Sequence, residues 1–259
     1  MRLVTISMVF VVLLTGCAAP GVGIPGGDEL ARAWRYGQHL LPQSALRENQ
    51  FKSISEIRAY PDAWVELVAA NKIKPEIKLP AVVYLHGCAG NRNGDYWGKL
   101  VNGLGFAFFA PDSLARPRES LCDTGNMKKL RIPLRNSELR YARRQLKRLD
   151  WIDQSRIVLL GFSEGAQTAA AYSGDEFAAI VLMGTNCRFS GGSPKAASSI
   201  AVLSLMGKND RYYEGLGCRI KRTVSGSKSR VIDGAGHNLR NNKEAVSEIR
   251  KFLQYVLRD

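Results

Sequence analysis

A serine flanked by glycines is the part of the sequence best suited to chemistry. Ser163 lies in Gly161-Phe162-Ser163-Glu164-Gly165, directly after an apolar run at 156–160 and at the start of an alanine-rich segment. Between a strand and a helix this pattern predicts a nucleophile elbow, a tight turn that glycines permit and that exposes the serine hydroxyl. The five letters alone are weakly specific, and a serine that caps an ordinary helix is the alternative.

His237 is the residue that could activate this hydroxyl, because a serine needs a base to become a nucleophile. It is the only histidine downstream of Ser163, and it ends the glycine-rich segment 233–237, which could carry it back over a sheet. His39 is expected to be a surface or packing residue, and His86 belongs to a different motif.

An acid is needed to orient the histidine and to stabilise its protonated form. Asp210 fits best, because it closes the segment GKND after a strong apolar run at 200–206. Asp175 and Asp233 are the rivals, but Asp175 lies at the end of the elbow helix and Asp233 is close in sequence to the histidine. The chain order serine, aspartate, histidine is that of α/β hydrolases.

Attack on a carbonyl also requires two N–H donors for the oxyanion. The residue after the nucleophile, Glu164, can supply one backbone N–H. Cys88, in His86-Gly87-Cys88-Ala89-Gly90 after the apolar run 81–85, is expected to supply the other.

At these residues the chain resembles the dienelactone hydrolase family of α/β hydrolases, over roughly residues 80–259. The resemblance rests on HGCAG, Trp97, FFAPDSLARPR, GFSEG, GKND and DGAGHNL. It implies a compact eight-stranded sheet without a large lid, and hydrolysis of ester or lactone bonds with no metal or organic cofactor. The name-giving enzymes use a cysteine nucleophile followed by glycines, whereas here Ser163 precedes Glu164. A serine esterase is therefore expected rather than a dienelactone hydrolase.

The elements that must position these residues alternate between short apolar runs and longer amphipathic ones. Strands are expected at 81–85, 105–110, 156–160, 178–183, 200–206 and 230–232, and helices at 96–104, 136–149, 163–172 and 242–257. The strands show little alternation, as strands buried on both faces should. This order predicts an α/β fold, the α/β-hydrolase fold, with a mostly parallel central sheet and helices on both faces.

The N-terminus has the pattern of a bacterial lipoprotein. Residues 1–16 read as a signal peptide, and Leu14-Thr15-Gly16-Cys17 resembles a lipobox, which would leave Cys17 lipid-modified. An ordinary secretory signal cut near Ala18 and Ala19 is the alternative. Residues 17–27 would be a flexible tether, 28–79 a mostly helical N-terminal extension of uncertain structure, and 80–259 the catalytic core. The expected location is the cell envelope, on the periplasmic face of the outer membrane if the host has two membranes.

The charge balance favours anionic partners. The formal net charge is +14, with many cations between Arg116 and Arg148. Anionic envelope components are candidates, nucleic acid is not expected to meet an exported protein, and a solvated helix face is the simpler explanation. Arg116 and Arg118 follow the strand at 105–110, so they could bind an acidic substrate group, with a surface role as the alternative.

Four cysteines remain once Cys17 is assigned to lipid, and an exported chain can oxidise them. Three pairings are possible. Cys88 with Cys122 and Cys187 with Cys218 are favoured, because each pair would join loops at one rim of the expected fold.

The sequence thus predicts an enzyme that hydrolyses a small-molecule ester or other acyl substrate through an acyl-enzyme on Ser163. A peptidase or an acyltransferase could use the same residues. A non-catalytic envelope lipoprotein that keeps the fold as a binding scaffold is the alternative from another class.

Overall fold

The computed structural model describes residues 27–42, 45, 78–116, 128–215 and 217–258. The signal peptide, Cys17, Arg118, Cys122 and nearly all of the tether lie outside these residues.

A single sheet of seven strands forms the centre of the described part of the chain. The strands are β1 (Gln38–Leu40), β2 (Leu79–Leu85), β3 (Ala107–Ala110), β4 (Ile152–Phe162), β5 (Ala179–Met183), β6 (Ala201–Gly207) and β7 (Lys228–Ile232). Their order across the sheet is β1-β3-β2-β4-β5-β6-β7. β2 to β7 all run parallel to one another, and β1 runs antiparallel to its neighbour β3. The predicted fold class is therefore confirmed.

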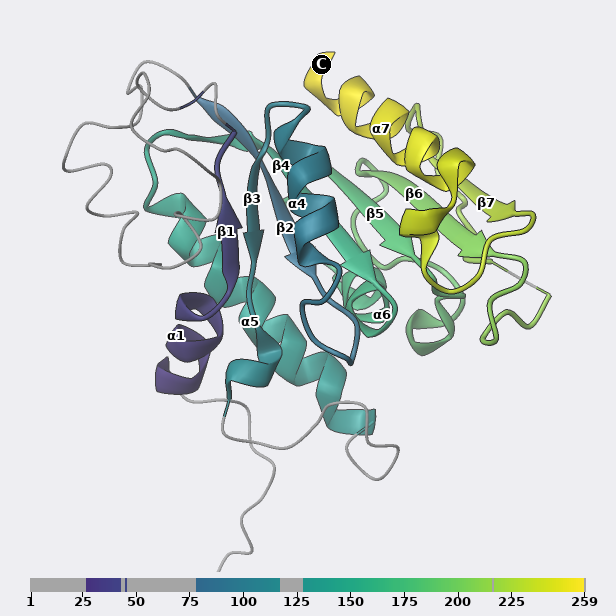
Figure 1. Cartoon of the computed structure of the whole chain (residues 1–259), viewed down its shortest axis with the longest axis horizontal. Helices are drawn as coiled ribbons and strands as arrows, with labels where there is room; N and C mark the ends of the chain where they lie inside the picture. The colour runs from purple at the N-terminus through teal and green to yellow at the C-terminus, as the bar shows by residue number, and fades with distance from the viewer. Residues whose placement is uncertain (1–26, 43–44, 46–77, 117–127, 216, 259) are drawn as a thin grey trace, which may run out of the picture.

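Helices cover both faces of this sheet (Figure 1). They are α1 (Gly27–Arg35), α4 (Gly94–Asn102), α5 (Lys128–Lys147), α6 (Glu164–Ala171) and α7 (Lys243–Arg258), with short 3-10 turns η2 (Ser113–Ala115), η3 (Arg188–Ser190) and η4 (Leu239–Asn241). Residues of α5 and α6 enter the apolar core on one face, and residues of α4 and α7 enter the core on the other. No helix of the described residues is long and apolar enough to cross a membrane.

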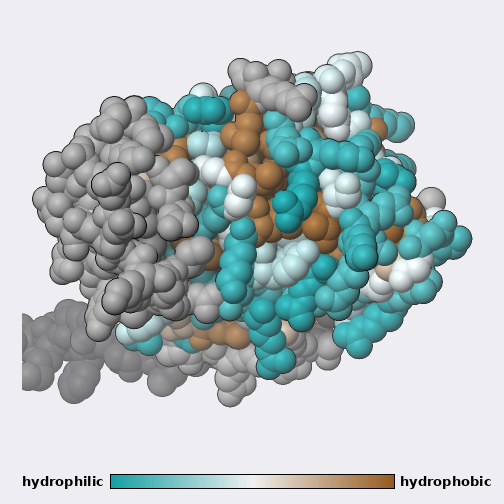
Figure 2. Space-filling model, turned by 45° about the horizontal axis from the view of Figure 1, so that its top comes forward, coloured by the Kyte–Doolittle hydropathy of each residue, from teal (hydrophilic) through white to brown (hydrophobic). Residues whose placement is uncertain are grey.

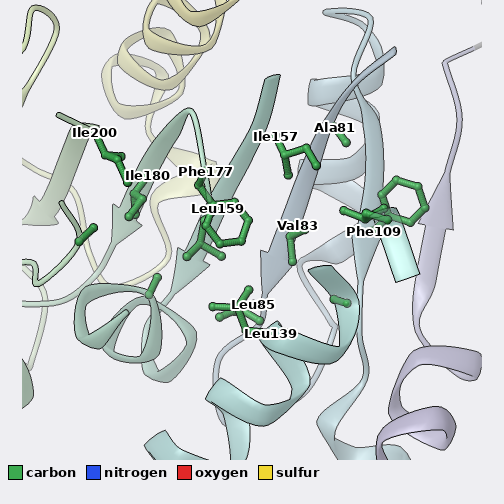
Figure 3. Close-up of a cluster of buried hydrophobic side chains, with 14 of the residues drawn as sticks. Ala81, Val83, Leu85, Phe109, Leu139, Ile157, Leu159, Phe177, Ile180 and Ile200 are labelled. Carbon is green, nitrogen blue, oxygen red and sulfur yellow. The ribbon is translucent and has the colours of Figure 1, made fainter. Parts of the chain in front are cut away.

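Continuous apolar strands explain why both faces are covered. Every residue of β2, β3, β5 and β6 is buried, so each strand presents apolar side chains to helices on either side. Figure 3 shows one of these cores, where Leu139 of α5 lies beside Leu85 of β2, with Leu159 of β4 next to them.

A strand from before residue 80 takes part in this sheet: β1 lies within the expected N-terminal extension, 28–79. His39 pairs with Phe109 in the β1–β3 ladder, and the ring of His39 also lies 4.5 Å from that of Trp34. Burial lowers the pKa of His39 to about 4, so it is a neutral packing residue. Within 28–79 the described residues include helix α1 and strand β1, whereas a mostly helical pattern was expected. A strand of only three residues is too short to show a period in the sequence.

Helix α5 begins earlier than predicted and buries some of its cations. The helix was expected over 136–149, whereas it begins at Lys128 and runs through Pro133, although proline usually breaks a helix interior. The predicted solvated face is wrong for Arg135 and Arg143, which are both buried. Long arginine stems can pack against a core when their guanidinium groups find partners, and Arg143 donates to Gln154.

A hollow of about 560 Å³ lies at the amino ends of the strands, lined among others by Val224, Tyr255 and Leu257. Figure 2 turns the upper end of the molecule in Figure 1 toward the viewer, and a strip of hydrophobic surface runs there between hydrophilic side chains. The residues predicted to do chemistry lie at the opposite, carboxyl ends of the strands.

We expect Leu40→Ala to destabilise the whole domain, because Leu40 is fully buried on β1. Truncation of a buried leucine costs about 2 to 5 kcal/mol, so the midpoint of urea unfolding should fall clearly. Tyr36→Ala is the control, since Tyr36 is 58% exposed. Equal midpoints for the two variants would show that β1 is not integral to the fold.

Candidate active site

Three loops at the carboxyl ends of parallel strands bring Ser163, Asp210 and His237 together. Ser163 follows β4, Asp210 follows β6 and His237 follows β7. The Nε2 atom of His237 lies 2.9 Å from Ser163 Oγ, and its Nδ1 atom lies 2.6 Å from Asp210 Oδ2. With the proton on Nδ1 donated to the carboxylate, Nε2 is free to accept the serine hydroxyl proton. The arrangement is that of a nucleophile, a base and an orienting acid.

Ser163 sits in a strained turn between β4 and α6. Its φ is 53° and its ψ is −115°, a region that non-glycine residues rarely adopt. Its backbone N–H donates to Met183 O at 2.8 Å, which holds the turn against β5. A Cβ on Gly161 would lie 2.6 Å from Gly165 O, and one on Gly165 would lie 2.0 Å from Leu85 O. Both flanking glycines are therefore required by close backbone packing.

Asp210 is buried and held by the backbone, whereas its rivals are not. Its second oxygen, Oδ1, accepts the backbone N–H of Tyr212 at 2.9 Å. Asp175 is exposed, and Asp233 is exposed and paired with Lys208. Among the three candidate acids, only Asp210 contacts His237.

The ring of His237 is fixed by packing as well as by hydrogen bonds. It lies 5.0 Å from the Phe162 ring and 5.0 Å, edge to face, from the Tyr212 ring. Gly184 passes so close that an added Cβ would lie 3.2 Å from the imidazole. The imidazole thus has little room to leave the geometry that joins Ser163 to Asp210.

A cavity of about 210 Å³ opens in front of the Ser163 hydroxyl. Its lining includes Cys88, Glu164 and His237, so both predicted oxyanion donors border the same space as the serine and the histidine. Two exposed aromatic residues, Phe189 and Tyr212, also line it. The cavity lining therefore combines polar groups with exposed aromatic rings.

The loop that carries Cys88 is fixed by His86. Because the backbone N–H of Ser113 donates to His86 Nε2 at 3.0 Å, the ring proton is on Nδ1, which donates to Gly87 O at 2.6 Å. Burial, together with the charges of Arg135 and Arg116, lowers the pKa of His86 well below 6.5. His86 is therefore neutral and structural.

A cluster of buried charges, not predicted from the sequence, lies beside the elbow. The Glu164 carboxylate pairs with Arg131 at 2.8 Å and with Arg135 at 3.4 Å. Arg116 is buried and pairs with Glu138 at 2.7 Å, so neither a substrate-binding nor a surface role holds for it. The sequence pattern that could have revealed this cluster is a glutamate beside the nucleophile together with arginines one helical turn apart.

The disulfides involve loops around the site. Cys187 and Cys218, the pair favoured from the sequence, are joined with 5.1 Å between their Cα atoms. This bond links the loop after β5 to the segment after β6. Cys88 is also disulfide-bonded. Its favoured partner, Cys122, lies outside the described residues, so that pairing stays a prediction.

Among the described residues, no group of three or more histidine, cysteine, aspartate or glutamate side chains is arranged to hold a metal ion.

Comparison with known proteins finds similarity in structure but not in sequence. No protein-family model and no curated protein sequence matches the chain. A hyperthermophilic esterase from Pyrobaculum calidifontis is similar at a TM-score of 0.50 and 17% identity, over 70% of this chain and 78% of that one. A protein from Xanthomonas campestris assigned to the α/β hydrolase superfamily is similar at 0.51 and 18%, over 69% and 99%.

A third similar structure is a protein from Bacteroides ovatus assigned as a dipeptidyl aminopeptidase IV, at a TM-score of 0.52 and 16% identity, over 71% of this chain and 32% of that one. Similarities at such low sequence identity bear on the fold alone. Together with the mostly parallel sheet, these structural similarities show that this chain has the α/β-hydrolase fold.

We expect His86 to make stability depend on pH. The folded chain excludes a proton that the unfolded chain binds below about pH 6.5, so the free energy of unfolding should fall as the pH drops, by up to about 1.4 kcal/mol per pH unit. His86→Gln lacks this titration. Urea unfolding at pH 7 and pH 5 should therefore show the stability difference between wild type and variant shrinking at pH 5. A constant difference would mean that His86 takes up the proton without cost.

Proposed function

We propose that this protein is a serine hydrolase that cleaves small carboxylic esters or lactones through an acyl-enzyme on Ser163. The observation that carries the proposal is the continuous hydrogen-bonded path from Ser163 Oγ through His237 to the buried Asp210, open to a cavity. A binding scaffold would have no need of this path together with a strained elbow.

The geometry supports the following reaction. Ser163 Oγ attacks the ester carbonyl carbon while His237 Nε2 takes the hydroxyl proton, and the carbonyl oxygen becomes an oxyanion. The backbone N–H groups of Cys88 and Glu164 would stabilise that oxyanion. As the carbonyl re-forms, the ester C–O bond breaks and His237 gives its proton to the leaving alcohol. Water then hydrolyses the acyl-enzyme by the same steps, which returns the proton to Ser163.

The cavity favours small substrates. Sites for drug-sized ligands enclose roughly 300 to 1,000 Å³, and this cavity encloses about 210 Å³. A short acyl group could enter, while a larger alcohol part would rest against the exposed rings of Phe189 and Tyr212. This size fits the serine-esterase variant of the dienelactone hydrolase family that the sequence resembles, and favours it over a peptidase acting on long chains.

The N-terminal pattern supports anchoring in the bacterial envelope through a lipid on Cys17. The +14 net charge would favour anionic envelope components near the protein.

We expect Ser163→Ala, tested in the full-length chain, to abolish labelling by a fluorophosphonate and to lower kcat on p-nitrophenyl acetate or butyrate by roughly 10⁴-fold or more. Asp210→Asn should also cost roughly 10⁴-fold, because the histidine would adopt the wrong tautomer. Asp233→Asn is the matched control and should keep full activity, since Asp233 is exposed. Folded wild type that neither labels nor turns over would favour the binding scaffold. Cleavage of peptide but not ester substrates would favour a peptidase.

Cys17→Ser should release the protein from the membrane fraction. Two or more acyl chains on Cys17 would anchor the wild type stably, whereas the variant has no site for the thioether. Partition of both proteins in a detergent phase separation measures the difference. Equal partition would indicate an ordinary cleaved signal instead.

A further inference from the structure

Buried charges anchor one of the two proposed oxyanion donors. The side chain of Glu164 is 8% exposed, and its oxygens lie 2.8 Å from Arg131 Nη1 and 3.4 Å from Arg135 Nη1. Both arginines belong to α5, which crosses the same face of the sheet as the elbow helix α6. Glu164, whose backbone N–H is the proposed donor next to the nucleophile, is thus held at its side-chain carboxylate by another helix.

The same charges continue from α5 into the loop after β3. Arg135 Nε lies 3.8 Å from Glu138 Oε2. The same oxygen accepts a hydrogen bond from the Ser113 hydroxyl at 2.5 Å. The other Glu138 oxygen pairs with Arg116 at 2.7 Å. Glu138 is 1% exposed and does not line the cavity. Any effect of Glu138 on a reaction must therefore pass through its partners.

The path ends at the second proposed donor. The backbone N–H of Ser113 donates to His86, and His86 donates to Gly87 O. That carbonyl shares one planar peptide group with the N–H of Cys88. A hydrogen bond that fixes the direction of Gly87 C=O therefore also fixes the direction in which the Cys88 N–H points.

We propose that the cluster of Arg116, Arg131, Arg135, Glu138 and Glu164 is a positioning device that sets the two oxyanion donors relative to each other. It joins the Glu164 main chain to the Gly87–Cys88 peptide through Arg135, Glu138, Ser113 and His86. Burial of so many charges usually contributes little net stability and is costly to break on one side. A positional function explains its presence beside the nucleophile. This inference rests on the proposed hydrolase function.

Glu138→Gln tests the device without touching the cavity. The amide keeps the shape of the side chain but loses the charge that pairs with Arg116 and Arg135. Glu248→Gln is the matched control. Glu248 lies on α7, is likewise buried, and pairs with Lys228 and Arg230, which do not belong to this cluster. In the ¹⁵N-labelled full-length chain, we expect the amide resonances of Cys88 and Glu164 to shift in Glu138→Gln and to stay in place in Glu248→Gln.

Kinetics then separate positioning from general damage. An ester and its thionoester analogue use the same serine and histidine, but a thiocarbonyl sulfur accepts N–H hydrogen bonds poorly, so it gains little from correctly placed donors. We expect Glu138→Gln to lower kcat for the ester roughly 10- to 100-fold with little change in KM. The thionoester rate should change much less, so that the ratio of the two rates falls.

The outcomes are distinct. Unmoved amides, or equal losses for ester and thionoester, would overturn the positioning role. If the wild type is inactive but the amide resonances of Cys88 and Glu164 still shift in Glu138→Gln, the hydrolase function is overturned and the mechanical link stands. If Glu138→Gln does not fold, Ser113→Ala serves instead. It removes only the hydroxyl bond to Glu138 and keeps the Ser113 N–H that His86 accepts, and the same shift and the same fall in ratio are expected.

Discussion

The backbone turn at Ser163 is the constraint on which the rest of the site depends. A non-glycine residue at φ 53° carries strain of about 1 to 3 kcal/mol, so its surroundings must hold it there. The bond from its N–H to Met183 and the tight packing of Gly161 and Gly165 provide this support. Because α6 can approach β2 only through Gly165, the turn also brings the elbow against the loop at His86.

Parallel strand topology places the other groups within reach of this turn. Asp210 and His237 lie 27 residues apart in the chain, yet both follow adjacent strands, β6 and β7, whose carboxyl ends meet at the same sheet edge. β5 and β6 are buried on both faces, which makes that edge rigid. A rigid edge is what allows side chains on loops to keep hydrogen-bond geometry.

Charge burial explains where sequence reasoning failed. Arginines on a helix are usually solvated, so those of α5 were expected to face water. Arg135 lies one turn before Leu139, on the apolar side of α5, whereas Arg140 does not, so the helical spacing does separate the two. Arg135 is fully buried and Arg140 is exposed, because Glu164 and Glu138 face one and not the other. Glu138 lies on α5 itself, but Glu164 belongs to another helix, so the sequence around Arg135 does not reveal this second partner. The edge strand β1 was not predicted for a related reason: it is recognised as a strand only by its pairing with β3, which lies on a distant segment.

The sequence by itself determined the α/β class, the order of nearly all strands and helices after residue 80, and the serine and the histidine that meet at the sheet edge. It could do so because unbroken apolar runs, a glycine-flanked serine and a glycine-rich loop before a histidine are local patterns with local physical causes. Only the tertiary structure decided which aspartate faces His237, that β1 completes the sheet, and that the arginines of α5 turn inward to Glu164. These depend on contacts between segments far apart in the chain, where burial and a specific oppositely charged partner outweigh the preference of a charge for water.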